Sequence, residues 1–164
     1  MKKYEKYIAG AKDLGIKEAI IIPTDSIVTA EWVRWKCQYG CNGFGGLTCP
    51  PNSPTPDQTK KIIADYRNAL LVHVDEFINL NEMLIKLEKM LFLDGYYKAF
   101  MMGGGPCHLC KECSEFCAHP DKARPSMEAC GIDVYATVKV HGFPIKVLKS
   151  KHDKVNFYGL ILIE

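Results

Sequence analysis

The sequence predicts an α/β protein in which helices pack on a mixed sheet of about five strands, in a single domain over residues 1–164. Three observations predict this class. The chain of 164 residues has the length of one ordinary domain. Segments with strand character alternate with segments of helical spacing. No internal repeat and no low-complexity tract interrupts this alternation.

The N-terminal third predicts a helix followed by a β-hairpin. Residues 2–14 carry apolar side chains at helical spacing, and Gly15 ends the segment. Residues 19–22 form a short apolar run that predicts a buried strand. Residues 27–35 alternate in character, which favours a second strand antiparallel to the first. Residues 37–54 are rich in glycine, cysteine and proline, so an irregular loop follows.

The middle of the chain has clearer signals. Thr55 and Gln58 have the spacing of a capping box, and Pro56 stands at the first helical position, so a helix begins there. The apolar run at residues 69–74 predicts a buried strand. Residues 79–93 carry leucine and methionine at helical spacing, which predicts an amphipathic helix.

The C-terminal part predicts two further strands and a helix. Residues 96–102 form a strand that leads into a second cysteine loop at residues 107–120. Residues 133–141 favour a helix and residues 157–163 a last strand. Both cysteine loops thus follow predicted strands. If those strands run parallel, the loops emerge at one edge of the sheet, where α/β proteins usually place their sites.

Composition and charge exclude several classes of protein. A hydrophobic content of 48% and a charged content of 24% are typical of globular proteins. The net charge of +2 is too small to indicate a nucleic-acid partner. No apolar run approaches the length of a membrane span, and the N-terminus lacks the pattern of a signal peptide. We therefore expect a cytoplasmic protein whose thiols stay reduced and serve metal binding or catalysis.

The second loop carries the more specific motif. Cys107, Cys110, Cys113 and Cys117 have the spacing C-x2-C-x2-C-x3-C. Bacterial ferredoxins use this run to ligate [4Fe–4S] clusters, and their fourth cysteine ligates a second cluster where two are present. Short gaps let successive thiolates reach different irons. The loop therefore predicts an iron–sulfur site.

The first loop has three cysteines within a glycine-rich stretch: Cys37, Cys41 and Cys49. Glycines allow backbone to approach a bulky ligand closely. Pro50 follows Cys49 as proline follows the last cysteine of ferredoxin motifs. Cys130 is the eighth cysteine.

Eight thiols favour two [4Fe–4S] clusters, each with three ligands from one loop. The predicted ligands are Cys107, Cys110 and Cys113 for one cluster, Cys37, Cys41 and Cys49 for the other, and Cys117 and Cys130 for the remaining positions in either order. Other arrangements stay open. One is a single cluster with the other cysteines structural. Another is zinc, although zinc sites usually pair two C-x2-C motifs over a longer separation.

The motifs also resemble those of a known family. The resemblance rests on Cys37-x3-Cys41-x7-Cys49-Pro-Pro, on the second cysteine run, and on residues 124–129 and 131–134. The chain resembles the DUF2284 family along nearly its whole length. Members of that family are described as predicted metal-binding proteins of bacteria and archaea, many of them anaerobes. The resemblance implies metal binding by seven cysteines: Cys37, Cys41, Cys49, Cys107, Cys110, Cys113 and Cys117.

Three functions follow from these predictions. The first is an electron carrier or accessory subunit that passes electrons to or from a redox partner protein. The second is a small iron–sulfur enzyme with one iron open to substrate, if Cys130 is not a ligand. The third is a zinc-stabilised interaction module.

Two other features give weaker predictions. Arg124 and Glu128 stand one helical turn apart and are candidates for an ion pair. Trp32 and Trp35 precede the first loop, and we expect at least one of them in the core.

Overall fold

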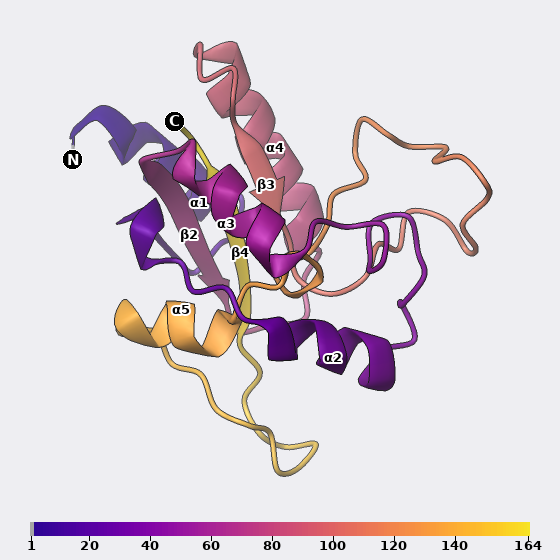
Figure 1. Ribbon diagram of the computed structural model, residues 1–164. Coiled ribbons are helices and arrows are strands. Elements are labelled where there is room, and N and C mark those ends of the chain that lie inside the picture. The colour runs from indigo at the N-terminus through magenta and orange to yellow at the C-terminus, as the bar shows by residue number, and fades with distance from the viewer. Residues whose placement is uncertain (1) are drawn as a thin grey trace.

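The computed structural model describes residues 2–164, which form one four-stranded sheet and five α-helices (Figure 1). The helices are α1 (Glu5–Asp13), α2 (Glu31–Gly40), α3 (Pro56–Ala64), α4 (Leu80–Leu93) and α5 (Val134–Val140). The strands are β1 (Glu18–Pro23), β2 (Asn68–Val74), β3 (Phe100–Met102) and β4 (Phe157–Leu162). Three short 3₁₀ turns are η1 (Lys2–Tyr4), η2 (Thr24–Ser26) and η3 (Glu128–Cys130).

The sheet has the order β1-β2-β4-β3, and every neighbouring pair is antiparallel. The α/β class is confirmed, but the prediction of a mixed sheet of about five strands is wrong in number and in direction. The alternation of strand and helix segments led to the prediction of parallel pairs, and the apolar run in β2 does not argue against it. Such runs are typical of parallel strands because helices cover both faces of a parallel sheet. Here helices cover both faces of an antiparallel one.

The two central strands divide their side chains between two cores. Leu70 and Val72 of β2, with Ile161 of β4, face α1 and α4. Leu71 and Leu160 point to the other face, toward α3, α5 and the turn η3. This period of two is the ordinary geometry of a strand. Apolar side chains thus cover both faces of the sheet, and the two cysteine loops lie outside it.

The second predicted strand, at residues 27–35, is wrong: the chain becomes helix α2 at Glu31. Residues before it are extended, and Thr29 makes an isolated bridge to Ile132. In α2 only Val33 is buried, while Trp32 and Trp35 are 48% and 71% exposed. Neither tryptophan is therefore in the core. The face predicted to be buried included the polar residues Thr29 and Glu31, so the alternation was weak evidence of burial.

Two helix predictions are confirmed. Thr55 accepts a hydrogen bond from the N–H of Gln58 at 3.2 Å and donates its own N–H to the Gln58 side chain at 2.9 Å. The helix predicted at residues 79–93 is α4, capped by Asn79. Of residues 96–102, only the last three are a strand. Among the described residues, no helix combines the length and the apolar character that crossing a membrane requires.

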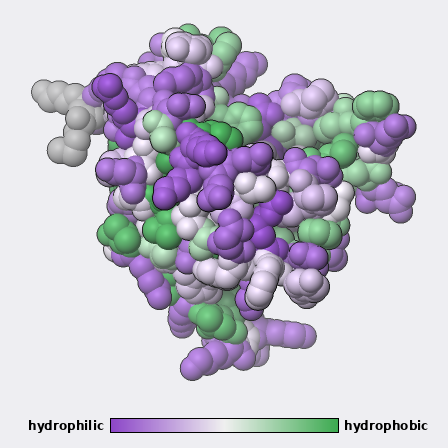
Figure 2. All heavy atoms as spheres, viewed as in Figure 1, coloured by the Kyte–Doolittle hydropathy of each residue, from purple (hydrophilic) through white to green (hydrophobic). Residues whose placement is uncertain are grey.

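The second cysteine loop projects from the body of the molecule at the right of Figure 1, beyond the end of β3. Figure 2 shows hydrophobic residues gathered on this projection. Leu109 is 43% exposed and Phe116 is 78% exposed. The loop thus offers apolar side chains to its surroundings.

Candidate metal centre

Neither cysteine loop contains a disulfide. All eight cysteines are free, and none forms a disulfide within the described part of the chain. Cys37 lies in the last turn of α2, and Cys41 is its C-terminal cap. Helix α2 thereby delivers the first two thiols four residues apart, on one side of the helix end. Cys49 follows in the loop and is 7% exposed.

Turns and hydrogen bonds build the first loop. The N–H of Gly46 donates to the carbonyl of Gly43 at 3.1 Å, and the N–H of Cys49 donates to the carbonyl of Gly46 at 3.0 Å. Gly45 has a φ of 90°, which favours glycine. The N–H of Gly43 donates to the Cys41 sulfur at 3.4 Å. The loop is therefore folded around its thiols by its own backbone.

The two cysteine loops are in contact. A Cβ at Gly43 would lie 2.7 Å from the Cβ of Pro106, so glycine permits an approach that a larger residue would prevent. Burial raises the pKa of the Cys49 thiol, and the nearby thiols of Cys41 and Cys107 raise it further. These thiols are thus electrostatic neighbours across the two loops.

Cys37 belongs to the same group. Its sulfur lies 3.9 Å from the carbonyl oxygen of Glu128. Burial raises the pKa of the Cys37 thiol, and Cys41, Glu128 and Cys49 act in the same direction. We call the four neighbouring thiols of Cys37, Cys41, Cys49 and Cys107 the inner site.

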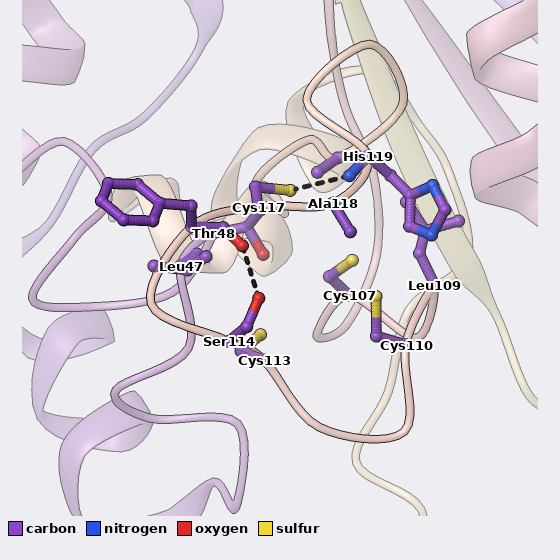
Figure 3. A pocket seen from close by; sticks show the side chains of 12 residues that line it. Leu47, Thr48, Cys107, Leu109, Cys110, Cys113, Ser114, Cys117, Ala118 and His119 are labelled. Atoms are coloured by element: carbon purple, nitrogen blue, oxygen red, sulfur yellow. Dashed lines mark hydrogen bonds between the residues drawn. The ribbon is translucent and has the colours of Figure 1, made fainter.

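The other thiols of the second loop line a neighbouring cavity of about 30 Å³ (Figure 3). Cys110, Cys113 and Cys117 line it together with Cys107 and His119. Cys110 and Cys113 are exposed, and the Cys117 sulfur accepts a hydrogen bond from the N–H of His119 at 3.4 Å. We call Cys110, Cys113 and Cys117 the outer site. Cys107 lies at the border of the two sites.

Cys130 has different surroundings. It is 2% exposed and packs in the apolar core with Met127 and Ile132. Burial raises the pKa of its thiol to about 12, which Arg34 opposes and Glu128 reinforces. Among the described residues, no other thiol contributes to this shift. The structure thus places the Cys130 thiol in the apolar core, away from solvent.

Arg34 is a supporting residue that the sequence interpretation missed. Its Nη1 donates to the carbonyls of Ser53 at 3.2 Å, Pro54 at 2.9 Å and Ala129 at 3.3 Å. Ser53 adds a 2.6 Å hydrogen bond from its hydroxyl to Ala129. Arg34 thus connects α2 to the end of the first cysteine loop and to the turn η3. Its position one turn before Cys37 would have been a signal only after the segment was recognised as a helix.

Both ends of the second loop are anchored on α4. The N–H of Gly104 donates to the side chain of Asn81 at 3.2 Å. At the other end, Arg124 makes a two-pronged ion pair with Glu88, with bonds of 3.1 and 2.7 Å. The predicted pair of Arg124 with Glu128 is therefore wrong. The carboxylate of Glu128 instead has a buried oxygen, Oε2, without a hydrogen-bond partner in the structure.

The donor chemistry of the two sites fits a soft metal. Within residues 2–164, no three side chains of histidine, cysteine, aspartate or glutamate converge closely enough to hold one ion as they stand. The donors are nevertheless free thiols gathered in two neighbouring sets. Thiolates select zinc, Cu(I) and iron–sulfur clusters over hard cations. Calcium and magnesium, which take oxygen ligands, do not fit these sites.

Comparison with known proteins agrees with this donor set. No curated protein and no solved structure matches the chain. A family model described as "Predicted metal-binding protein (DUF2284)" matches residues 20–163, which include all eight cysteines, so the chain belongs to the DUF2284 family of predicted metal-binding proteins.

Proposed function

We propose that the chain is an iron–sulfur protein that holds [4Fe–4S] clusters at the inner and outer sites and exchanges electrons with a redox partner protein. The neighbouring thiols of the inner site carry this proposal. Cys37, Cys41 and Cys49 come from the end of α2 and the loop after it, and Cys107 comes from a distant part of the sequence. The cluster run C-x2-C-x2-C-x3-C supports iron over zinc. When bound, such clusters supply one-electron transfer.

Hydrogen bonds to sulfur support the same assignment. Backbone N–H groups already donate to two of the thiols: Gly43 to Cys41 and His119 to Cys117. Such bonds stabilise thiolates and tune the potential of a cluster. In residues 105–118, no backbone N–H donates a hydrogen bond to a backbone carbonyl. These donors remain for the sulfur atoms of a cluster.

The outer site is the natural place for contact with a partner. Cys110 and Cys113 are exposed, whereas Cys49 of the inner site is buried. Leu109 and Phe116 lie beside the outer thiols on the projecting loop. Apolar contact there would exclude water from the path of the electron.

Anaerobic purification followed by assay of iron, zinc and acid-labile sulfide tests the proposal. We expect iron and sulfide in equal amounts, and an EPR signal after reduction. Cys41→Ser is expected to remove the iron of the inner site, and Cys113→Ser that of the outer site. Cys130→Ala is the matched control and should keep the iron content of the native chain. A colourless protein with zinc and no sulfide would contradict the proposal.

Contact between the loops gives a second prediction. Gly43→Ala is expected to weaken metal binding at the inner site by about 10- to 100-fold, because the added methyl group displaces Pro106 and with it Cys107. Titration with Co²⁺, followed by thiolate-to-cobalt absorption, measures this change. Gly40→Ala is the control, since nothing lies within 4 Å of a Cβ there. Equal affinities for the two variants would show that loop contact does not position the ligand.

A further inference from the structure

We infer that the two sites differ in how readily their metal exchanges ligands. The inner site retains its metal, and the outer site exchanges metal-bound thiolates with thiolates from outside the chain. This inference rests on the proposed function, since it requires metal at both sites. It adds that the outer metal takes thiols from outside the chain as ligands, and that these thiols reach it from the solvent. Burial, backbone bonding and ligand number carry it.

Burial separates the two sites. In the inner site Cys49 is buried, and Cys37, Cys41 and Cys107 are half-buried. In the outer site Cys110 and Cys113 are exposed and only Cys117 is half-buried. An external thiolate must reach the metal to displace a ligand, and the rate of thiolate exchange depends on access. The outer metal is therefore the accessible one.

Backbone bonding separates them further. The inner loop is fixed by turns, and the N–H groups of Asn52 and Ser53 add bonds of 2.8 and 3.1 Å to the carbonyl of Cys49. Between residues 105 and 118, no backbone carbonyl or N–H of the described chain bonds to another backbone group. One outer ligand can therefore leave without breaking a backbone bond, whereas Cys49 of the inner site must carry its hydrogen-bonded turn with it.

The outer segment is nevertheless tethered at both ends. Gly103 donates its N–H to the carbonyl of Pro125 at 3.1 Å, and Met127 donates to Gly103 at 2.9 Å. The segment thus leaves and rejoins the body at one point, next to the ion pair of Arg124 with Glu88. Long loops without regular structure in compact domains are usually functional or disordered. Here the loop keeps three thiols at the cavity without backbone–backbone hydrogen bonds of its own.

Ligand number completes the argument. Cys107 lines the outer cavity, but the adjacent Pro106 packs against Gly43 of the first loop, so we assign its thiol to the inner site as the fourth ligand. The outer site then has three thiols of its own. Cys130 is in the core. A metal at the outer site therefore has one position for a ligand from outside. In the exchange, the incoming thiolate would bind at this open position and one cysteine thiolate would then leave, so the number of ligands and the charge are restored and no electron moves.

Metal release tests this inference on the full chain. The protein is loaded with Zn²⁺ as probe, freed of excess metal and mixed with a chromogenic chelator, with and without glutathione. We expect two phases that differ in rate by about tenfold or more. Glutathione should accelerate only the fast phase. Cys113→Ser should remove the fast phase and Cys41→Ser the slow one, while Cys130→Ala should keep both.

The outcomes separate the inference from the proposed function. A single phase that releases all the zinc, or a fast phase lost in Cys41→Ser and kept in Cys113→Ser, would overturn the inference and leave metal binding intact. Absence of bound zinc and iron in the native chain would overturn the proposed function. A second readout uses the metal-free protein: a maleimide should modify Cys110 and Cys113 before Cys49. Equal rates at these three positions would contradict the difference in access.

Discussion

Replacement of Arg124 by methionine is expected to lower the free energy of unfolding by about 3–5 kcal/mol. The side chains of Arg124 and Glu88 are 16% and 12% exposed, so the pair is largely removed from water. Glu88 also accepts the N–H of Met101 at 2.6 Å, which ties α4 to β3. Without the guanidinium, a carboxylate remains buried next to the apolar core with one neutral donor. Urea denaturation followed by circular dichroism measures the loss.

The control for this prediction is an exposed ion pair on the same helix. Lys86 lies 2.9 Å from Glu82 one turn away, and both side chains are more than half exposed. Lys86→Met should cost only about 0.3–0.5 kcal/mol. A similar small loss for Arg124→Met would mean that the buried pair does not anchor the end of the second cysteine loop.

Gly131→Ala is expected to destabilise the protein by about 2–5 kcal/mol. Gly131 has a φ of 75°, and its Cβ would lie 2.4 Å from Cγ and 3.1 Å from Cα of Pro56, the first residue of α3. The left-handed conformation alone costs about 1–2 kcal/mol for alanine. The collision adds to this because the proline ring is rigid and capped in place by Thr55.

Gly142→Ala separates the two causes. Gly142 has a φ of 76°, but nothing lies within 4 Å of its Cβ position. Its replacement should therefore cost only the conformational part, about 1–2 kcal/mol. Thermal and urea unfolding of the two variants give the difference. Equal losses would show that the contact of Gly131 with Pro56 relaxes without cost.

Local signals in the sequence predicted most of the helices and the central strand. The capping box of Thr55 and Gln58 defines its helix by short-range bonds, so neighbours along the chain suffice to predict it. The same holds for α4, whose leucine spacing matches one buried face. The strand at residues 27–35 failed because alternation over few residues does not distinguish a strand from a helix that leaves its tryptophans exposed.

The site was predictable in composition but not in grouping. Spacing predicted that Cys107 belongs with Cys110 and Cys113, whereas the fold places it beside Cys49 as well. That neighbourhood depends on the contact of Gly43 with Pro106, which no local pattern encodes. The partnership of Arg124 with Glu88 likewise joins residues from distant segments. Long-range contacts of this kind follow from the packing of elements. Helical spacing alone led to Glu128, instead of Glu88, as the predicted partner of Arg124.

The composite origin of the inner site has a consequence for biosynthesis. Cys37, Cys41 and Cys49 emerge from the ribosome first, and about a third of the chain must follow before Cys107 appears. Ala129, whose carbonyl accepts a hydrogen bond from Arg34, is synthesised later still. At a translation rate of roughly 5–20 residues per second, the delay is on the order of several seconds. For that interval the nascent thiols face the solvent without their fourth neighbour, so oxygen or a stray metal encounters them before the native pocket exists.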